Sequence, residues 1–178
     1  MEFAFVAPVM IGMFFGLTEL ALALGVHADV INLASVGSDL VAQESTVTTA
    51  DMTNVFSALS AMLYPYSTAP AQITISSITD NNSGASAGAA NPTGTVAWSC
   101  TQGGTARSGT YSFPTAAQGV VTRGSGGSVI MTEVSYSYTL PVTIRIPGII
   151  NLSGPYAMSS TFYSKPRRVT TIPAPTCP

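Results

Sequence analysis

Positive charge is absent from the first part of this 178-residue chain, where no lysine or arginine precedes Arg107. The same stretch carries seven acidic residues: Glu2, Glu19, Asp29, Asp39, Glu44, Asp51 and Asp80. The net charge of −2 and the absence of a basic patch argue against a nucleic-acid partner. A secretory signal peptide has a basic n-region, and a membrane segment needs cytoplasmic positive charge to set its orientation. We therefore expect a basic leader upstream of Met1, which is either cleaved or was lost through a late start.

Histidine and cysteine are scarce as well. His27 is the single histidine, so the GxSxG pattern at residues 84–88 has no nearby base for a serine triad, and we expect no enzymatic activity. A lone histidine also builds no metal site, and we expect neither a metal nor a cofactor. The two cysteines, Cys100 and Cys177, lie too far apart for a CxxC motif. In an oxidising compartment they predict one disulfide, the alternative being two independent buried thiols.

Charged residues of both signs make up only 8% of the chain, far below the usual quarter. Glycine, serine, threonine and alanine dominate the remainder, as is common in exported bacterial surface proteins. The length suits one domain, or a membrane anchor followed by one modest domain.

The strongest feature present is an apolar run at the N-terminus. No polar side chain occurs from Phe3 to Leu17, and with Leu20–Val26 the run is long enough to cross a bilayer. The carboxylate of Glu2 stands at its start. We predict a membrane anchor over residues 1–28.

Two helices are expected. One long helix runs from residue 3 to about residue 44, with Pro8 kinking it or locally opening its hydrogen bonds. Thr48 and Asp51 fit a capping box that begins a second helix, and Pro65 ends it, so residues 29–64 form a helical extension and a second helix. The apolar stripe predicted for this second helix is Met52, Val55, Phe56, Leu59 and Met62.

Alternating and β-branched patterns predict strands at residues 72–79, 95–101, 128–140 and 155–164. In the second of these, Val96, Trp98 and Cys100 are expected on one face. The fold class predicted is therefore α+β: a long N-terminal helix, a short second helix, and a small antiparallel sheet of about four strands. The β-rich domain is assigned to residues 65–178.

The N-terminal residues also resemble a known family. Glu2-Phe3-Ala4, then Pro8, then the segment Phe15–Leu20 (FGLTEL) are similar to the EFA…P…FG(x)xE pattern of the TadE-like family of minor pilins and pseudopilins. The strand around Trp98, the tyrosine-rich strand near residue 136 and the late KPRR at residues 165–168 resemble the family's C-terminal half more loosely.

The resemblance implies a non-enzymatic structural subunit of a tight-adherence (Flp-type) pilus system. Its partners would be the inner membrane, other pilin or pseudopilin subunits, the pilus-assembly machinery, and a prepilin peptidase cutting shortly before the glutamate. The chain would pass once through the bacterial inner membrane, with its C-terminal domain in the periplasm, and would help to initiate or regulate pilus assembly and surface adhesion. The alternative is a membrane-anchored periplasmic binding or adhesin module that never enters a fibre.

Four residues are the candidates for assembly: Glu2, Phe3, Pro8 and Glu19. The resemblance implies that Glu2 attracts the free amine of a neighbouring subunit, because a carboxylate in hydrocarbon is costly unless it is paired. The alternative is a solvated Glu2 in the headgroup region. Glu19 lies about 25 Å further along the helix and either reaches the far interface or faces a partner.

Overall fold

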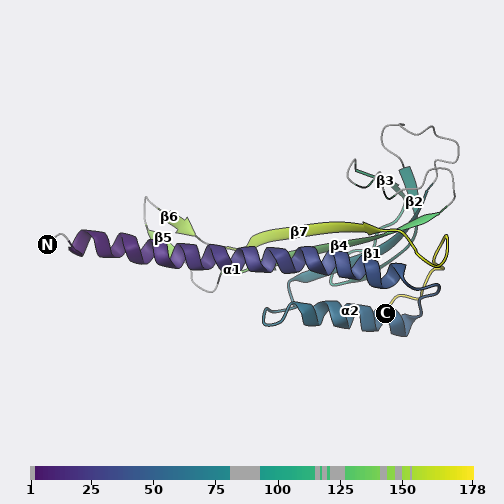
Figure 1. Ribbon diagram of the computed structural model, residues 1–178, viewed down its shortest axis with the longest axis horizontal. Coiled ribbons are helices and arrows are strands. Elements are labelled where there is room, and N and C mark those ends of the chain that lie inside the picture. Colours follow the sequence, from purple (N-terminus) through teal and green to yellow (C-terminus); the bar gives the residue numbers. More distant parts are fainter. Residues whose placement is uncertain are drawn as a thin grey trace.

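The computed structural model describes residues 3–80, 93–114, 117, 120, 127–140, 144–146, 150–152 and 154–178. The elements, in chain order, are α1 (Phe3–Ala42), α2 (Thr49–Met62), β1 (Ala71–Asp80), β2 (Thr93–Gln102), β3 (Thr110–Ser112), β4 (Ser128–Tyr138), β5 (Ile144–Ile146), β6 (Ile150–Leu152) and β7 (Tyr156–Ser164). The predicted α+β class is confirmed, with two helices and an antiparallel sheet (Figure 1).

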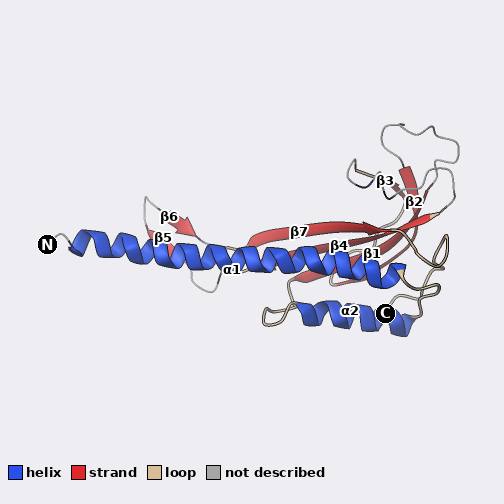
Figure 2. Cartoon of the chain, viewed as in Figure 1, coloured by secondary structure: helices blue, strands red, loops and turns tan. Residues whose placement is uncertain are grey.

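The main sheet has five strands in the order β3-β2-β1-β4-β7, and each neighbouring pair is antiparallel. The sequence predicts four of these strands. The fifth, β3, is only three residues long, which is too short to show an alternating pattern. The strands β5 and β6 form a separate hairpin (Figure 2).

Both helices cover the same face of the sheet, and the hydrophobic core lies between the helices and that face. The C-terminal half of α1 packs against β4 and β7, and α2 packs beside α1. Buried apolar side chains from both helices and from β1, β2 and β4 form one cluster between these layers. It includes Val30, Leu33, Phe56, Leu59, Ile73, Ile75, Trp98 and Val134. The N-terminal half of α1 extends beyond the sheet (Figure 1).

The start of α2 follows the predicted capping box. The Asp51 amide donates to the Thr48 hydroxyl, and the Thr48 amide donates to the Asp51 carboxylate at 3.0 Å. The predicted apolar stripe is wrong at its end, because Met62 is 39% exposed while Leu63 is fully buried. Leu63 lies four residues after the buried Leu59, so it continues the same face of the helix and Met62 does not.

A β-bulge changes the predicted face of β2. Ser77 pairs with Trp98 and Ile78 pairs with Val96, so Ala97 is the extra residue. Trp98 and Cys100 therefore share one face, as predicted, and that face packs against the helices. Val96 is on the opposite face, where it packs with Ile78 and contributes to a second apolar cluster.

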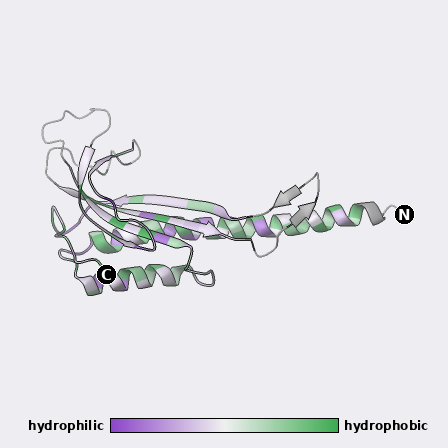
Figure 3. Cartoon of the chain, turned by 180° about the vertical axis from the view of Figure 1, so that it is seen from behind, coloured by the Kyte–Doolittle hydropathy of each residue, from purple (hydrophilic) through white to green (hydrophobic). Residues whose placement is uncertain are grey.

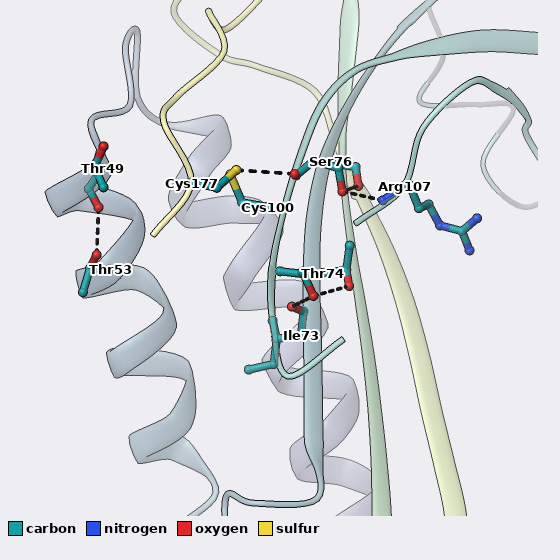
Figure 4. The surroundings of a disulfide bond; sticks show 10 residues. Thr49, Thr53, Ile73, Thr74, Ser76, Cys100, Arg107 and Cys177 are labelled. Carbon is teal, nitrogen blue, oxygen red and sulfur yellow. Dashed lines mark hydrogen bonds between the residues drawn. A yellow bond between two sulfur atoms is a disulfide. The ribbon is translucent and has the colours of Figure 1, made fainter. Parts of the chain in front are cut away.

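The C-terminal tail returns to the sheet and is held there at three points. The Ser128 amide donates to the Thr170 carbonyl at 2.8 Å, and the Trp98 indole donates to the Ile172 carbonyl at 2.9 Å. Cys100 and Cys177 form a disulfide with their Cα atoms 5.3 Å apart (Figure 4). The tail has no regular structure of its own, so these contacts attach it to β2 and β4.

Candidate functional site

The projecting half of α1 is the first candidate site. Within the described residues one helix, over Val6–Ala42, is long and apolar enough to cross a membrane. Among the described residues, large apolar side chains in its N-terminal part are exposed: Phe14 is 68% exposed and Leu17 is 63% exposed. Further exposed apolar side chains on it are Val6, Val9, Met10, Ile11, Met13, Phe15, Leu20 and Leu24. Hydrophobic residues predominate along this projection (Figure 3).

Burial along α1 changes about halfway. From Val26 onward, residues spaced three or four apart are buried, among them Val30, Leu33 and Val41. Before Val26 the packed stripe continues only through small or polar residues (Gly12, Gly16, Glu19 and Ala23), while the large apolar side chains around it are exposed. The same helix thus has one half suited to an apolar surrounding and one half suited to the sheet.

Glu19 is the exception in the projecting half. Its side chain is only 4% exposed, although Leu17 and Leu20 beside it are exposed. It lines an apolar groove of about 380 Å³ between α1 and the ends of β4 and β7. The other groove residues are Gly16, Leu20, Ala23, Leu24, His27, Leu140, Tyr156, Ala157 and Met158.

The surroundings of Glu19 are electrostatically connected to β4. The pKa of the Tyr138 hydroxyl is raised above its ordinary value, first by burial and second by the negative charge of Glu19. The carboxylate therefore lies where the projecting helix meets the domain, and it faces the protein's own sheet.

Three of the four predicted assembly residues, Phe3, Pro8 and Glu19, belong to this helix. Glu2 lies outside the described residues, and Phe3 is the first residue of α1. Pro8 lies inside α1 within its exposed apolar part. The structure separates Glu19 from these residues, because it places Glu19 against Tyr156 and Met158 of β7.

Sequence reasoning missed the partners of Glu19 in the groove. Leu140 follows β4, and Tyr156 and Met158 belong to β7, all more than 100 positions along the chain. No local pattern links them to residue 19, since only the antiparallel pairing of β4 with β7 brings them together. The described part of the chain holds no group of three or more His, Cys, Asp or Glu side chains able to bind a metal.

The match to a known protein family also falls on α1. The family model for TadE-like protein matches residues 1–39, a range that contains the exposed half of α1 and most of its packed half. Comparisons with curated proteins and with solved structures gave no match. The chain is thus similar to the TadE-like family over residues 1–39, in agreement with the resemblance seen at its N-terminus.

Proposed function

We propose that this protein is a structural minor pilin or pseudopilin of a tight-adherence pilus system, and that it helps to initiate or regulate pilus assembly and surface adhesion. The observation that carries the proposal is the apolar half of α1, which projects from the domain and lies within the TadE-like match. The chain acts as a subunit and not as an enzyme.

The size of the exposed segment supports this role. The apolar stretch of residues 6–24, whose large side chains are exposed while Glu19 and Ala23 pack on the domain, rises about 28 Å at 1.5 Å per residue, close to the roughly 30 Å of a bilayer's hydrocarbon core. An apolar helix of this length is stable when lipid covers it, and equally when the helices of neighbouring subunits cover it. A subunit that moves from the membrane into a fibre needs a helix that is stable in both surroundings.

The remaining domain suits an oxidising compartment, because its tail is fixed by the Cys100–Cys177 disulfide. We place this domain in the periplasm and the projecting helix in the inner membrane. Glu2 then acts in subunit assembly by pairing with the N-terminal amine of a neighbour, after a prepilin peptidase has cut before it. The pairing replaces the hydration that the carboxylate loses in the membrane.

A substitution at Glu2 tests the proposal. Glu2→Ala should leave membrane fractionation and thermal unfolding of the protein unchanged, while it reduces the number of pili and surface attachment. The matched control is Glu44→Ala, which removes an exposed carboxylate beyond the end of α1. The control should form normal pili.

Normal piliation in the Glu2→Ala strain would contradict the assembly role. If surface attachment instead depended on the protein while pili were normal, and the protein were absent from sheared pili, it would be an anchored adhesin module outside the fibre. Immunoblots of sheared pili and of membrane fractions distinguish these outcomes.

A further inference from the structure

The face of the sheet turned away from the helices contains a second cavity, unrelated to the projecting helix. It has a volume of about 590 Å³ and lies over β1, β4 and β7, beside the segment Gly104–Ser108 that follows β2. At one end of this face the side chains of Phe113 and Ala117 cover Ile78. The other end, where the cavity lies, is polar.

Strand register arranges the cavity floor in two rows. Gln72, Ser135 and Ser159 lie directly opposite one another across β1, β4 and β7, and Thr74, Glu133 and Thr161 form the next row. All six residues line the cavity. Neighbouring strands are about 4.8 Å apart, so the floor presents polar side chains at regular intervals on the sheet, four of them serine or threonine.

Hydrogen bonds fix part of this floor in place. The Thr74 and Thr101 hydroxyls are 3.1 Å apart, and the Ser135 hydroxyl donates to Gln72 Oε1 at 3.3 Å. The Arg107 amide donates to the Ser99 hydroxyl at 3.0 Å and so holds the wall segment against β2. Figure 4 shows Thr74, Ser76 and Arg107 along this side of the sheet.

The cavity has almost no net charge. The Arg107 guanidinium donates two hydrogen bonds to the Glu133 carboxylate, and it lies 5.4 Å from the centre of the Tyr111 ring. The hydrogen bond to Glu133 raises the pKa of Arg107, so this side chain stays charged and paired. The two charges neutralise each other, so neither stands alone to attract an ionic ligand.

We propose that this cavity binds a neutral saccharide. The hydroxyls and the Gln72 amide on the floor are able both to donate and to accept hydrogen bonds, as are the hydroxyls of a sugar, and the Gln72 amide nitrogen is able to donate while its oxygen accepts from Ser135. Serine and threonine lose little side-chain freedom when a ligand fixes them, in contrast to long charged residues. The polar lining disfavours an apolar ligand, the paired charges disfavour an ion, and the volume is within the range of small-molecule sites.

Saturation-transfer NMR with lactose, maltose and N,N′-diacetylchitobiose tests the proposal. The full chain is kept in lauryldimethylamine oxide micelles, because a glycoside detergent would compete for the site. At least one of the three sugars should bind saturably. Thr161→Val and Gln72→Ala should each weaken this binding about 2- to 12-fold, the equivalent of one lost hydrogen bond of 0.5–1.5 kcal/mol.

Thr110→Val is the matched control, since Thr110 is an exposed strand threonine on β3 outside the cavity. It should leave sugar binding unchanged, and thermal unfolding should show that all three variants fold. Absence of binding by all three sugars would overturn the proposal. Binding that Thr161→Val and Gln72→Ala do not weaken would also overturn it, as would preferential binding of inorganic phosphate or of a serine-rich peptide. The test is independent of pilus assembly.

Discussion

Two side chains, Thr48 and Asp51, determine where α2 begins. Their reciprocal hydrogen bonds satisfy amides that the first turn of a helix leaves without partners. Hydrogen bonds from the Thr48 hydroxyl and then the Thr48 amide lower the pKa of Asp51 below its ordinary value of 3.8. A carboxyl group whose pKa is lower in the folded state stabilises the fold above its unfolded-state pKa, and the effect is lost as the pH falls through the folded-state value.

Asp51→Ala should therefore lower the free energy of unfolding at pH 7, and the difference from the wild type should shrink as the pH falls below 3.8. Denaturant unfolding between pH 2 and pH 7 measures it. Thr48→Ala should cost about 1 kcal/mol and should weaken the same pH dependence, because it removes the bonds to the carboxylate. A constant difference between Asp51→Ala and wild type over this pH range would show that the capping box does not contribute as described.

The sequence predicts the contacts of an individual residue only where those contacts are made to its neighbours along the chain. The capping box is predicted correctly because Thr48 and Asp51 are three residues apart. Val96 is misassigned because the bulge at Ala97 depends on pairing with β1. The burial of Glu19 is missed for the same reason, because it depends on contact with β7, and no local sequence pattern in β7 indicates that contact.

At the scale of elements, α1 is held to the sheet through a close approach at Gly37. A Cβ atom added there would lie 3.0 Å from Leu59 Cδ1 and 3.0 Å from Thr132 Cγ2. The absent side chain therefore lets α1 lie against α2 and β4 together. Gly25 occupies the same helix, but a Cβ atom there would have nothing within 4 Å.

Gly37→Val should destabilise the protein by about 1–3 kcal/mol, since α1 must move away from Leu59 and Thr132 to accept the larger side chain. Gly25→Ala is the matched control and should stabilise the helix by up to about 1 kcal/mol through helix propensity. Thermal unfolding of the full chain in micelles measures both. Equal effects of the two substitutions would contradict the close packing at Gly37.

The long elements are those that the sequence predicts best. α1, α2 and the strands β1, β2, β4 and β7 follow from sustained apolar patterns, and their observed ends differ from expectation by a few residues. The short strand β3 and the hairpin strands β5 and β6, each of three residues, are missed. Three residues carry too little periodicity, so only pairing with a partner strand defines such elements.

At the scale of the whole molecule, the disulfide connects the end of the chain to β2 of the main sheet. Reducing it, or replacing Cys177 by serine, should lower the free energy of unfolding by about 4 kcal/mol in the chain-entropy model for a loop of this length. Denaturant unfolding with and without dithiothreitol checks this. Dithiothreitol should lower the free energy of unfolding of the wild type and should leave that of Cys177→Ser unchanged. If dithiothreitol leaves the wild-type value unchanged, the disulfide does not stabilise the fold.

The division of α1 into an exposed half and a packed half predicts how the chain tolerates truncation. Val26 is fully buried in the core cluster, and Ala23 packs against it. A chain that begins at Asp29 loses both contacts, whereas a chain that begins at Gly16 keeps them together with the Glu19 groove. Burying one valine contributes about 2 kcal/mol, so the longer chain should be more stable by at least this amount.

Both truncated chains, exported to an oxidising compartment so that the disulfide forms, should be monomeric without detergent and should unfold cooperatively. Their circular dichroism should show mixed helix and strand, because the part of α1 from Val30 to Val41 still covers the sheet. Size-exclusion chromatography and thermal unfolding make the comparison. If both truncated chains aggregate or lack a cooperative transition while the full chain in detergent unfolds cooperatively, the exposed half of α1 belongs to the folded core. The anchor would then be part of the domain and not a segment available to lipid or to neighbouring subunits.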